Sequence, residues 1–163
     1  MTKPNEEEIN ALYQIIGFMT VTWSLLERGL DKIALTIYKG CEGHTIKRKV
    51  PQALKDKLEY IENSFNKLQV LSDFQKEGLA IVNKTRELKE KRHTLIHGAI
   101  SSLYPENNSY IFTKYNFHKK GVTLEATTFS PIDFQRVSED CQNLAENTAH
   151  FSVKLIDRFL KQQ

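Results

Sequence analysis

The sequence predicts an all-α protein: an antiparallel four-helix bundle with a small antiparallel β-meander inserted before the last helix. Apolar side chains recur at helical spacing through most of the first 98 residues and again after residue 130. Between about residues 99 and 128, the period changes to an alternation rich in β-branched and aromatic residues, which is typical of strands. A chain of 163 residues fits a single domain, 1–163, with one continuous core.

The first helix is expected from about residue 4 to residue 39. Pro4 suits a first helical position, and Gly40 can close the helix. Glu27 lies on its apolar face, where an unpaired carboxylate is costly. Two interpretations of Glu27 stay open: an ion pair with Arg92, or a place at the edge of the apolar stripe with lysine or water as partner. That apolar face comprises Ile9, Leu12, Tyr13, Ile16, Met19, Trp23, Leu26, Leu30, Ile33 and Ile37.

A loop over residues 40–50 leads to a second helix, expected from Pro51 to about Leu68, with Lys57 on its solvated face. A third helix follows, with Ser72 and Gln75 at the spacing of a capping box at its start, and it ends at Gly98. The strands are expected at 100–104, 109–117 and 122–128.

The clearest helix start is Ser130-Pro131-Ile132-Asp133, with a serine N-cap, a proline in the first turn and an acid three residues after the cap. The apolar stripe of this last helix includes Cys141, which is therefore expected in the core.

Polar chemistry is concentrated in residues 89–98. Arg92 lies on the apolar stripe of the third helix, and His97 stands in its last turn, before Gly98 as the expected C′ residue. Arg92 and His97 are about 140° apart around an ideal helix, but fraying at the helix end and the length of arginine let their heads converge. The other interpretation of Arg92 is structural, with its stem covering apolar surface and its head reaching water or a carboxylate.

The segment Arg92-His93-Thr94-Leu95-Ile96-His97, called the Arg/His motif below, resembles the Arg-x4-6-His motif of HEPN proteins. The expected bundle is similar to the HEPN architecture, and a first helix with an inward aromatic and glutamate is similar to that of several HEPN families. The resemblance implies a metal-independent endoribonuclease without cofactor, in which the motifs of a homodimer form one cleft and the RNA 2′-hydroxyl attacks the adjacent phosphate. It implies that Arg92 binds the phosphate, that His97 is the general acid or base, and that His93 is a supporting contact.

The same resemblance implies a role in defence or in a toxin–antitoxin system, with an antitoxin or defence-system protein as partner. Ala99 stands where one toxin subgroup has a tyrosine that a nucleotidyltransferase modifies, so that particular partner is not expected. A non-catalytic dimeric interaction or nucleotide-binding module stays open as the alternative, because many HEPN-like bundles are not enzymes.

Lys89, Lys91 and Arg86 form a modest positive rim around the motif and are candidate RNA-binding residues. The aromatic residues of the meander have two interpretations: a stacking surface for bases, or the face by which the sheet packs on helices. These residues are Tyr104, Tyr110, Phe112, Tyr115 and Phe117.

The composition limits other classes of function. A net charge of +3 permits nucleic-acid contact without arguing for it. No apolar run is expected to reach the length of a membrane span, and the acidic start is the opposite of a secretory leader, so a cytoplasmic protein is expected. Cys41-x2-His44 with His93-x3-His97 offers metal-ligand types, but the two pairs are far apart in the sequence and no metal site is expected. The two cysteines are expected as reduced thiols rather than nucleophiles.

Overall fold

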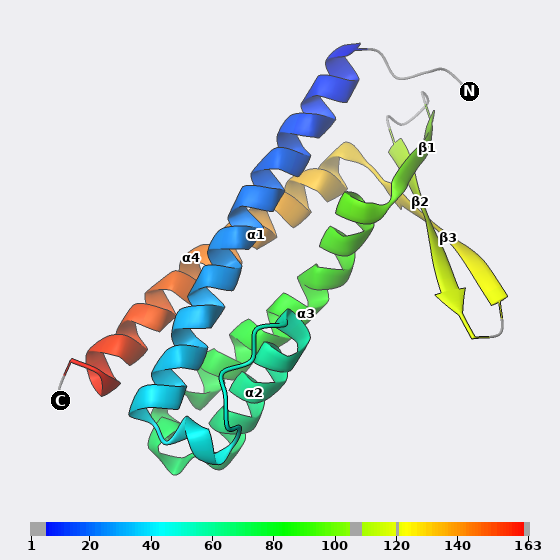
Figure 1. The fold of residues 1–163 in the computed structure, drawn as a ribbon. Helices are drawn as coiled ribbons and strands as arrows, with labels where there is room; N and C mark the ends of the chain where they lie inside the picture. The colour runs from blue at the N-terminus through cyan, green and yellow to red at the C-terminus, as the bar shows by residue number, and fades with distance from the viewer. Residues whose placement is uncertain (1–5, 105–108, 120, 162–163) are drawn as a thin grey trace. The chain divides into compact units, whose positions relative to one another are not determined.

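The computed structural model describes residues 6–104, 109–119 and 121–161. Over these ranges the chain is mostly helical, with a three-stranded antiparallel sheet before the last long helix, which confirms the predicted class and order of elements (Figure 1). The elements are α1 (Glu6–Gly40), a 3-10 turn (Gly43–Thr45), α2 (Leu54–Lys67), a 3-10 helix (Gln69–Phe74), α3 (Gln75–His97), β1 (Ala99–Tyr104), β2 (Ser109–His118), β3 (Gly121–Phe129) and α4 (Pro131–Phe159).

The chain forms two compact units, and α1, α3 and α4 each contribute to both. Unit 1 comprises residues 1–21 and 87–141, and unit 2 comprises residues 22–86 and 142–163. The single domain expected from chain length stays a prediction.

Unit 2 is a helical bundle held by contacts between consecutive helices. The buried Lys57 of α2 pairs with Asp31 of α1, so its predicted solvated position is wrong. Lys154 of α4 pairs with Glu77 of α3 at 3.0 Å between Nζ and Oε1. The core of this unit includes Leu26, Leu30, Ile33, Ile37, Leu58, Ile61, Phe65, Leu71, Phe151 and Leu155.

Two helix starts in unit 2 differ from the prediction. The α2 helix begins at Leu54 rather than at Pro51, with an extended Ala53 before it. The α3 helix begins at Gln75, after a 3-10 helix has carried the chain around from α2.

Unit 1 contains the sheet, whose strand order is β1-β2-β3. The β2 and β3 strands pair from Tyr110 with Phe129 to His118 with Gly121, and no register shift interrupts them. β1 pairs with β2 and carries an irregularity between Ile100 and Ser102. The predicted meander is therefore confirmed, with each strand one or two residues longer than expected.

An aromatic cluster joins the sheet to the start of α4. The ring of Phe134 lies 5.9 Å from Phe112, 5.5 Å from Phe129 and 5.6 Å from Tyr110, measured between centroids. Tyr110 and Phe112 thus belong to the face that packs on the helix. Tyr115 and Phe117 remain exposed, and the side chain of Tyr104 lies outside the described residues.

The predicted start of α4 is confirmed in detail. The Ser130 hydroxyl donates to Asp133 Oδ2 at 2.6 Å, and the Ser130 N–H donates to the same oxygen at 2.9 Å. The Asp133 N–H donates back to Ser130 Oγ at 3.3 Å. These reciprocal bonds satisfy orphan donors of the first turn, which is the function of a capping box.

The expectation that no segment is long and apolar enough to span a membrane is wrong for α1. Its segment Ile9–Gly40 meets that test by length and composition, with 28% of its most apolar window buried. The core helix of a soluble protein passes the same test, so the cytoplasmic location stays a prediction.

Candidate functional site

The Arg/His motif occupies the last turns of α3, as the helical spacing predicted. His97 is the final residue of the helix, and the Gly98 N–H donates to the Thr94 carbonyl oxygen at 2.8 Å. Arg92 and His93 are half-buried, whereas His97 is exposed. The helix therefore presents His97 to solvent at the point where β1 begins.

The two histidines of the motif are in contact. His93 and His97 are four residues apart, which puts them on one face of the helix one turn from each other. Their ring centroids lie 4.7 Å apart with an interplanar angle of 52°. The convergence of Arg92 with His97, in contrast, stays a prediction.

Gly98 is needed at this position because there is no room for a Cβ, and not because its backbone has an unusual conformation. Among the described glycines, Gly121 is the one with positive φ, so Gly98 is not the left-handed C′ residue that commonly ends a helix. A Cβ at position 98 would lie 2.4 Å from the Thr94 oxygen and 3.2 Å from Phe112 Cβ. Glycine at this position lets the chain turn from α3 directly into β1 against the aromatic cluster.

Lys114 of β2 is a member of the site that the sequence did not indicate. The pKa of His93 is lowered, first by burial and then by the positive charge of Lys114, with smaller effects of His97 and Arg92 in the same direction. Glu90 acts in the opposite sense. Near neutral pH, His93 is therefore an uncharged imidazole within a group of cations.

The predicted RNA-binding lysines lie on the same helix segment in unit 1. Lys91 approaches Glu87 at 3.7 Å, and Lys89 approaches Glu90 at 3.9 Å, between Nζ and Oε1 in each pair. Such long, exposed ion pairs contribute little and leave the ammonium groups accessible. The pKa of Asp133 is lowered mainly by the hydrogen bonds of Asp133 with Ser130. The charges of Arg136 and then of Lys91 lower it further.

Two other predicted site residues lie in unit 2, each with a partner there. The Arg86 guanidinium donates two hydrogen bonds to the carboxylate of Glu62, at 2.8 and 2.7 Å. The Glu27 carboxylate accepts a hydrogen bond from the Trp23 indole N–H at 2.9 Å. The pairing of Glu27 with Arg92 and an RNA contact by Arg86 both stay predictions, and for Arg86 that contact competes with a bidentate pair.

The cysteines are poorly suited to nucleophilic or metal chemistry. Both thiols are buried, which confirms the core position predicted for Cys141 but was not predicted for Cys41 in its loop. Burial raises the pKa of Cys41 to about 11, so its sulfur stays protonated at neutral pH and is a weak ligand and nucleophile. In the described part of the chain, no three side chains of histidine, cysteine, aspartate or glutamate come together as a metal site would require.

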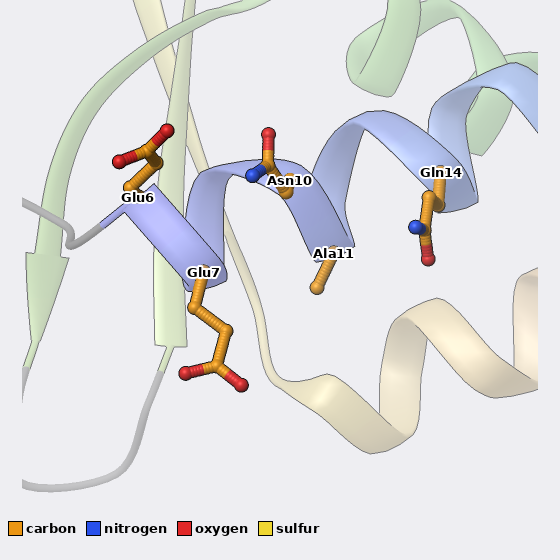
Figure 2. A pocket seen from close by; sticks show the side chains of 5 residues that line it. All are labelled: Glu6, Glu7, Asn10, Ala11 and Gln14. Atoms are coloured by element: carbon orange, nitrogen blue, oxygen red, sulfur yellow. The ribbon is translucent and has the colours of Figure 1, made fainter.

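A shallow, open depression of about 560 Å³ lies on the first turns of α1. Figure 2 shows the five side chains that line it, all from α1 and none from the Arg/His motif. They are Glu6, Glu7, Asn10, Ala11 and Gln14. Its two carboxylates would repel a phosphate, so this depression is not a candidate RNA site.

Fold and site together define a mostly helical protein with a histidine pair and neighbouring cations at the end of its third long helix. No protein-family model, curated protein or solved structure matches the chain. The resemblance to HEPN proteins therefore stays a prediction from the sequence.

Proposed function

We propose that this protein is a metal-independent endoribonuclease of the HEPN kind that acts as a homodimer in defence or in a toxin–antitoxin system. The observation that carries the proposal is the contact between His93 and His97 at the exposed end of α3, with Lys114 beside His93. Two imidazoles among cations suit the cleavage of a phosphodiester, because the reaction moves protons and develops negative charge on phosphate oxygens.

In the proposed reaction, a base removes the proton of an RNA 2′-hydroxyl, whose oxygen attacks the adjacent phosphorus. The bond from phosphorus to the 5′-oxygen breaks, an acid protonates that oxygen, and a 2′,3′-cyclic phosphate is formed. His97 acts as acid or base because it is the exposed histidine of the pair. The guanidinium fork of Arg92 binds the phosphate and stabilises its charge in the transition state.

His93 and Lys114 have supporting roles. His93 is uncharged at neutral pH because burial and nearby cations oppose its protonation, so it can exchange hydrogen bonds with the substrate or orient His97. Lys114 adds a cation from the sheet beside the helix end, where it attracts the RNA backbone. Lys89 and Lys91 extend this positive surface along α3.

The test is cleavage of a single-stranded RNA by purified variants. His97→Ala and Arg92→Ala are each expected to lower the rate by about 10²-fold or more, the scale of a lost acid–base or charge-stabilising group. His93→Ala should lower it less. His150→Ala is the matched control, because His150 is an exposed histidine of α4 in unit 2. Cleavage should persist in EDTA and give 2′,3′-cyclic phosphate ends or their hydrolysis product.

The His97→Ala result is decisive, because His97 is exposed at a helix end and its truncation has a small structural cost. Circular dichroism and light scattering establish that the variant is folded and retains its mass. A folded His97→Ala protein that cuts RNA as fast as wild type would contradict the ribonuclease. It would favour a non-catalytic interaction or nucleotide-binding module.

A further inference from the structure

The outer face of the β2–β3 hairpin is apolar and uncovered. Side chains alternate along each strand, so the residues of β2 that face away from Phe112 share a face with their partners on β3. The exposed fractions are 62% for Tyr115, 80% for Phe117, 55% for Val122 and 58% for Leu124. Four large apolar side chains gathered on one face of a small sheet mark an interaction surface.

The same hairpin has an uncovered edge. The β3 strand has β2 as neighbour on one side, and its residues from Gly121 to Ala126 are all exposed. Proteins protect such edges with prolines, bulges or charges. The β3 strand has no proline and no register shift. Its charged residue, Glu125, lies on the face opposite to the apolar one and accepts a hydrogen bond there from Asn116 at 2.9 Å. Its backbone is thus open to pairing with another strand.

The chemistry of this face favours a protein partner over nucleic acid. Its residues carry no charge: Ile111, Thr113, Tyr115, Phe117, Val122, Leu124, Ala126 and Thr128. A surface that binds single-stranded RNA combines aromatic rings with cations that track the phosphates. Half of the large exposed side chains here are aliphatic, and Lys114, the lysine within the two paired strands, lies on the other face.

We propose that β3 pairs with β3 of a second copy of this chain, antiparallel and centred on Leu124, to form a continuous six-stranded sheet. A strand that pairs with itself in this way has a two-fold axis, which is the commonest symmetry of homodimers. In this register Leu124 lies opposite Leu124 of the partner subunit, and Val122 lies opposite Ala126 of the partner subunit. Glu125 then faces Thr123 of the partner subunit, whereas a register centred on Glu125 would oppose two carboxylates.

The interface also bears on the proposed active site, and this step rests on the proposed function. The two-fold axis of such a pair is perpendicular to the sheet, so both copies of Lys114 lie on the same side of it. From a strand spacing of about 4.8 Å and a rise of about 3.4 Å per residue, their Cα atoms would be roughly 16 Å apart. Two groups of His93, His97 and Lys114 would then flank one surface, which an RNA strand can bridge.

A disulfide test locates the axis. In Leu124→Cys, two sulfurs meet at the two-fold axis, so mild oxidation should convert most of the protein to a crosslinked dimer. Tyr115→Cys is the matched control, because Tyr115 is equally exposed on the same face but pairs with Leu124 one strand further from the axis. Its Cα would be about 14 Å from its symmetry mate, too far for a disulfide. Cys41 and Cys141 are buried and should not react.

A second test exchanges the charge at position 124 and measures the mass of the protein in solution. Wild type should have about twice the 18.9 kDa of one chain at tens of micromolar. Leu124→Lys and Leu124→Glu should each be monomeric, because two like charges meet at the axis. A mixture of the two variants should return to dimer, since opposite charges then face each other. Circular dichroism should show both variants folded, because Leu124 is exposed in the single chain.

Several outcomes would overturn the interface, whatever the His97→Ala cleavage assay shows. Wild type with the mass of one chain would do so, as would Leu124→Lys that remains dimeric. Efficient crosslinking of Tyr115→Cys would indicate that the two faces pack against each other instead. Loss of RNA binding in Leu124→Lys without a change in mass would identify RNA as the ligand of this face. Cleavage by a protein that dimerises elsewhere would leave the proposed function intact.

Discussion

His93 is the residue whose surroundings most clearly differ from those of an ordinary surface histidine. Burial and the charge of Lys114 are the two largest causes of its lowered pKa. Removing that charge should let the imidazole take up its proton more easily. We therefore expect the pKa of His93 to rise in Lys114→Gln, measured from the imidazole proton resonances by NMR titration.

The control for this titration is Lys119→Gln. It removes an exposed lysine after the end of β2 and leaves the charge of Lys114 in place. It should leave the pKa of His93 unchanged. Equal values in wild type and Lys114→Gln would show that the charge of Lys114 does not contribute to the lowered pKa of His93.

Single residues also show what the sequence can and cannot predict. The placement of the Arg/His motif at a helix end followed from local spacing and a glycine. The proximity of Lys114 to His93 could not be read in advance, because it depends on how a strand after a turn lies against the helix before it. Lys57 was wrongly placed in solvent because a helical stripe indicates which face is apolar, but not whether a long cation is covered at its edge.

Among the elements, the junction from α3 to β1 is the one that sets the position of His97. Gly98→Ala would put a Cβ against the Thr94 oxygen and near Phe112, and both neighbours yield little because one is a backbone atom and the other a buried side chain. We expect a loss of about 1–3 kcal/mol in the free energy of unfolding, measured in urea, the range found for overpacked sites. The resonances of His97 should shift, because the end of the helix must move.

Gly17→Ala is a suitable control for the junction. Gly17 lies in α1, also in unit 1, and a Cβ there meets nothing within 4 Å. Alanine should therefore be neutral or stabilise the helix by up to about 1 kcal/mol. A Gly98→Ala protein as stable as wild type would mean that the junction is not tightly packed.

Elements were predictable where their ends are determined locally. The start of α4 is encoded by Ser130 and Asp133, which satisfy each other's hydrogen bonds. The meander was also predictable locally, because the alternation of side chains along each strand is visible in the sequence. The starts of α2 and α3 were missed because an extended residue precedes α2 and a 3-10 helix precedes α3, and neither segment begins with a side-chain cap that the sequence could reveal.

For the whole molecule, the net charge of +3 is too small to guide RNA binding, so the local cations must do so. We expect single-stranded RNA to bind His97→Ala, used here to prevent cleavage, with an affinity that falls as salt rises. Lys91→Gln and Lys114→Gln, made in that background, should each lower the slope of log affinity against log salt by about 1. Fluorescence anisotropy at several salt concentrations measures this slope.

Lys154→Gln is the control at this scale, because Lys154 lies in unit 2 and is paired with Glu77. Its slope should match the parent protein. Unchanged slopes for Lys91→Gln and Lys114→Gln would place the RNA elsewhere. Which RNA is bound, and in which biological programme, depends on partners that folding rules do not determine.

The two cysteines of this chain divide between its two units, Cys41 in unit 2 and Cys141 in unit 1, and both thiols are buried. A thiol reagent can modify each sulfur only after the surrounding unit has opened, so the two labelling rates are natural clocks for local unfolding. If the rates respond equally to denaturant, the continuous helices α1, α3 and α4 transmit the opening of one unit to the other. If they respond differently, unit 1, which carries the histidine pair, can open while unit 2 stays folded.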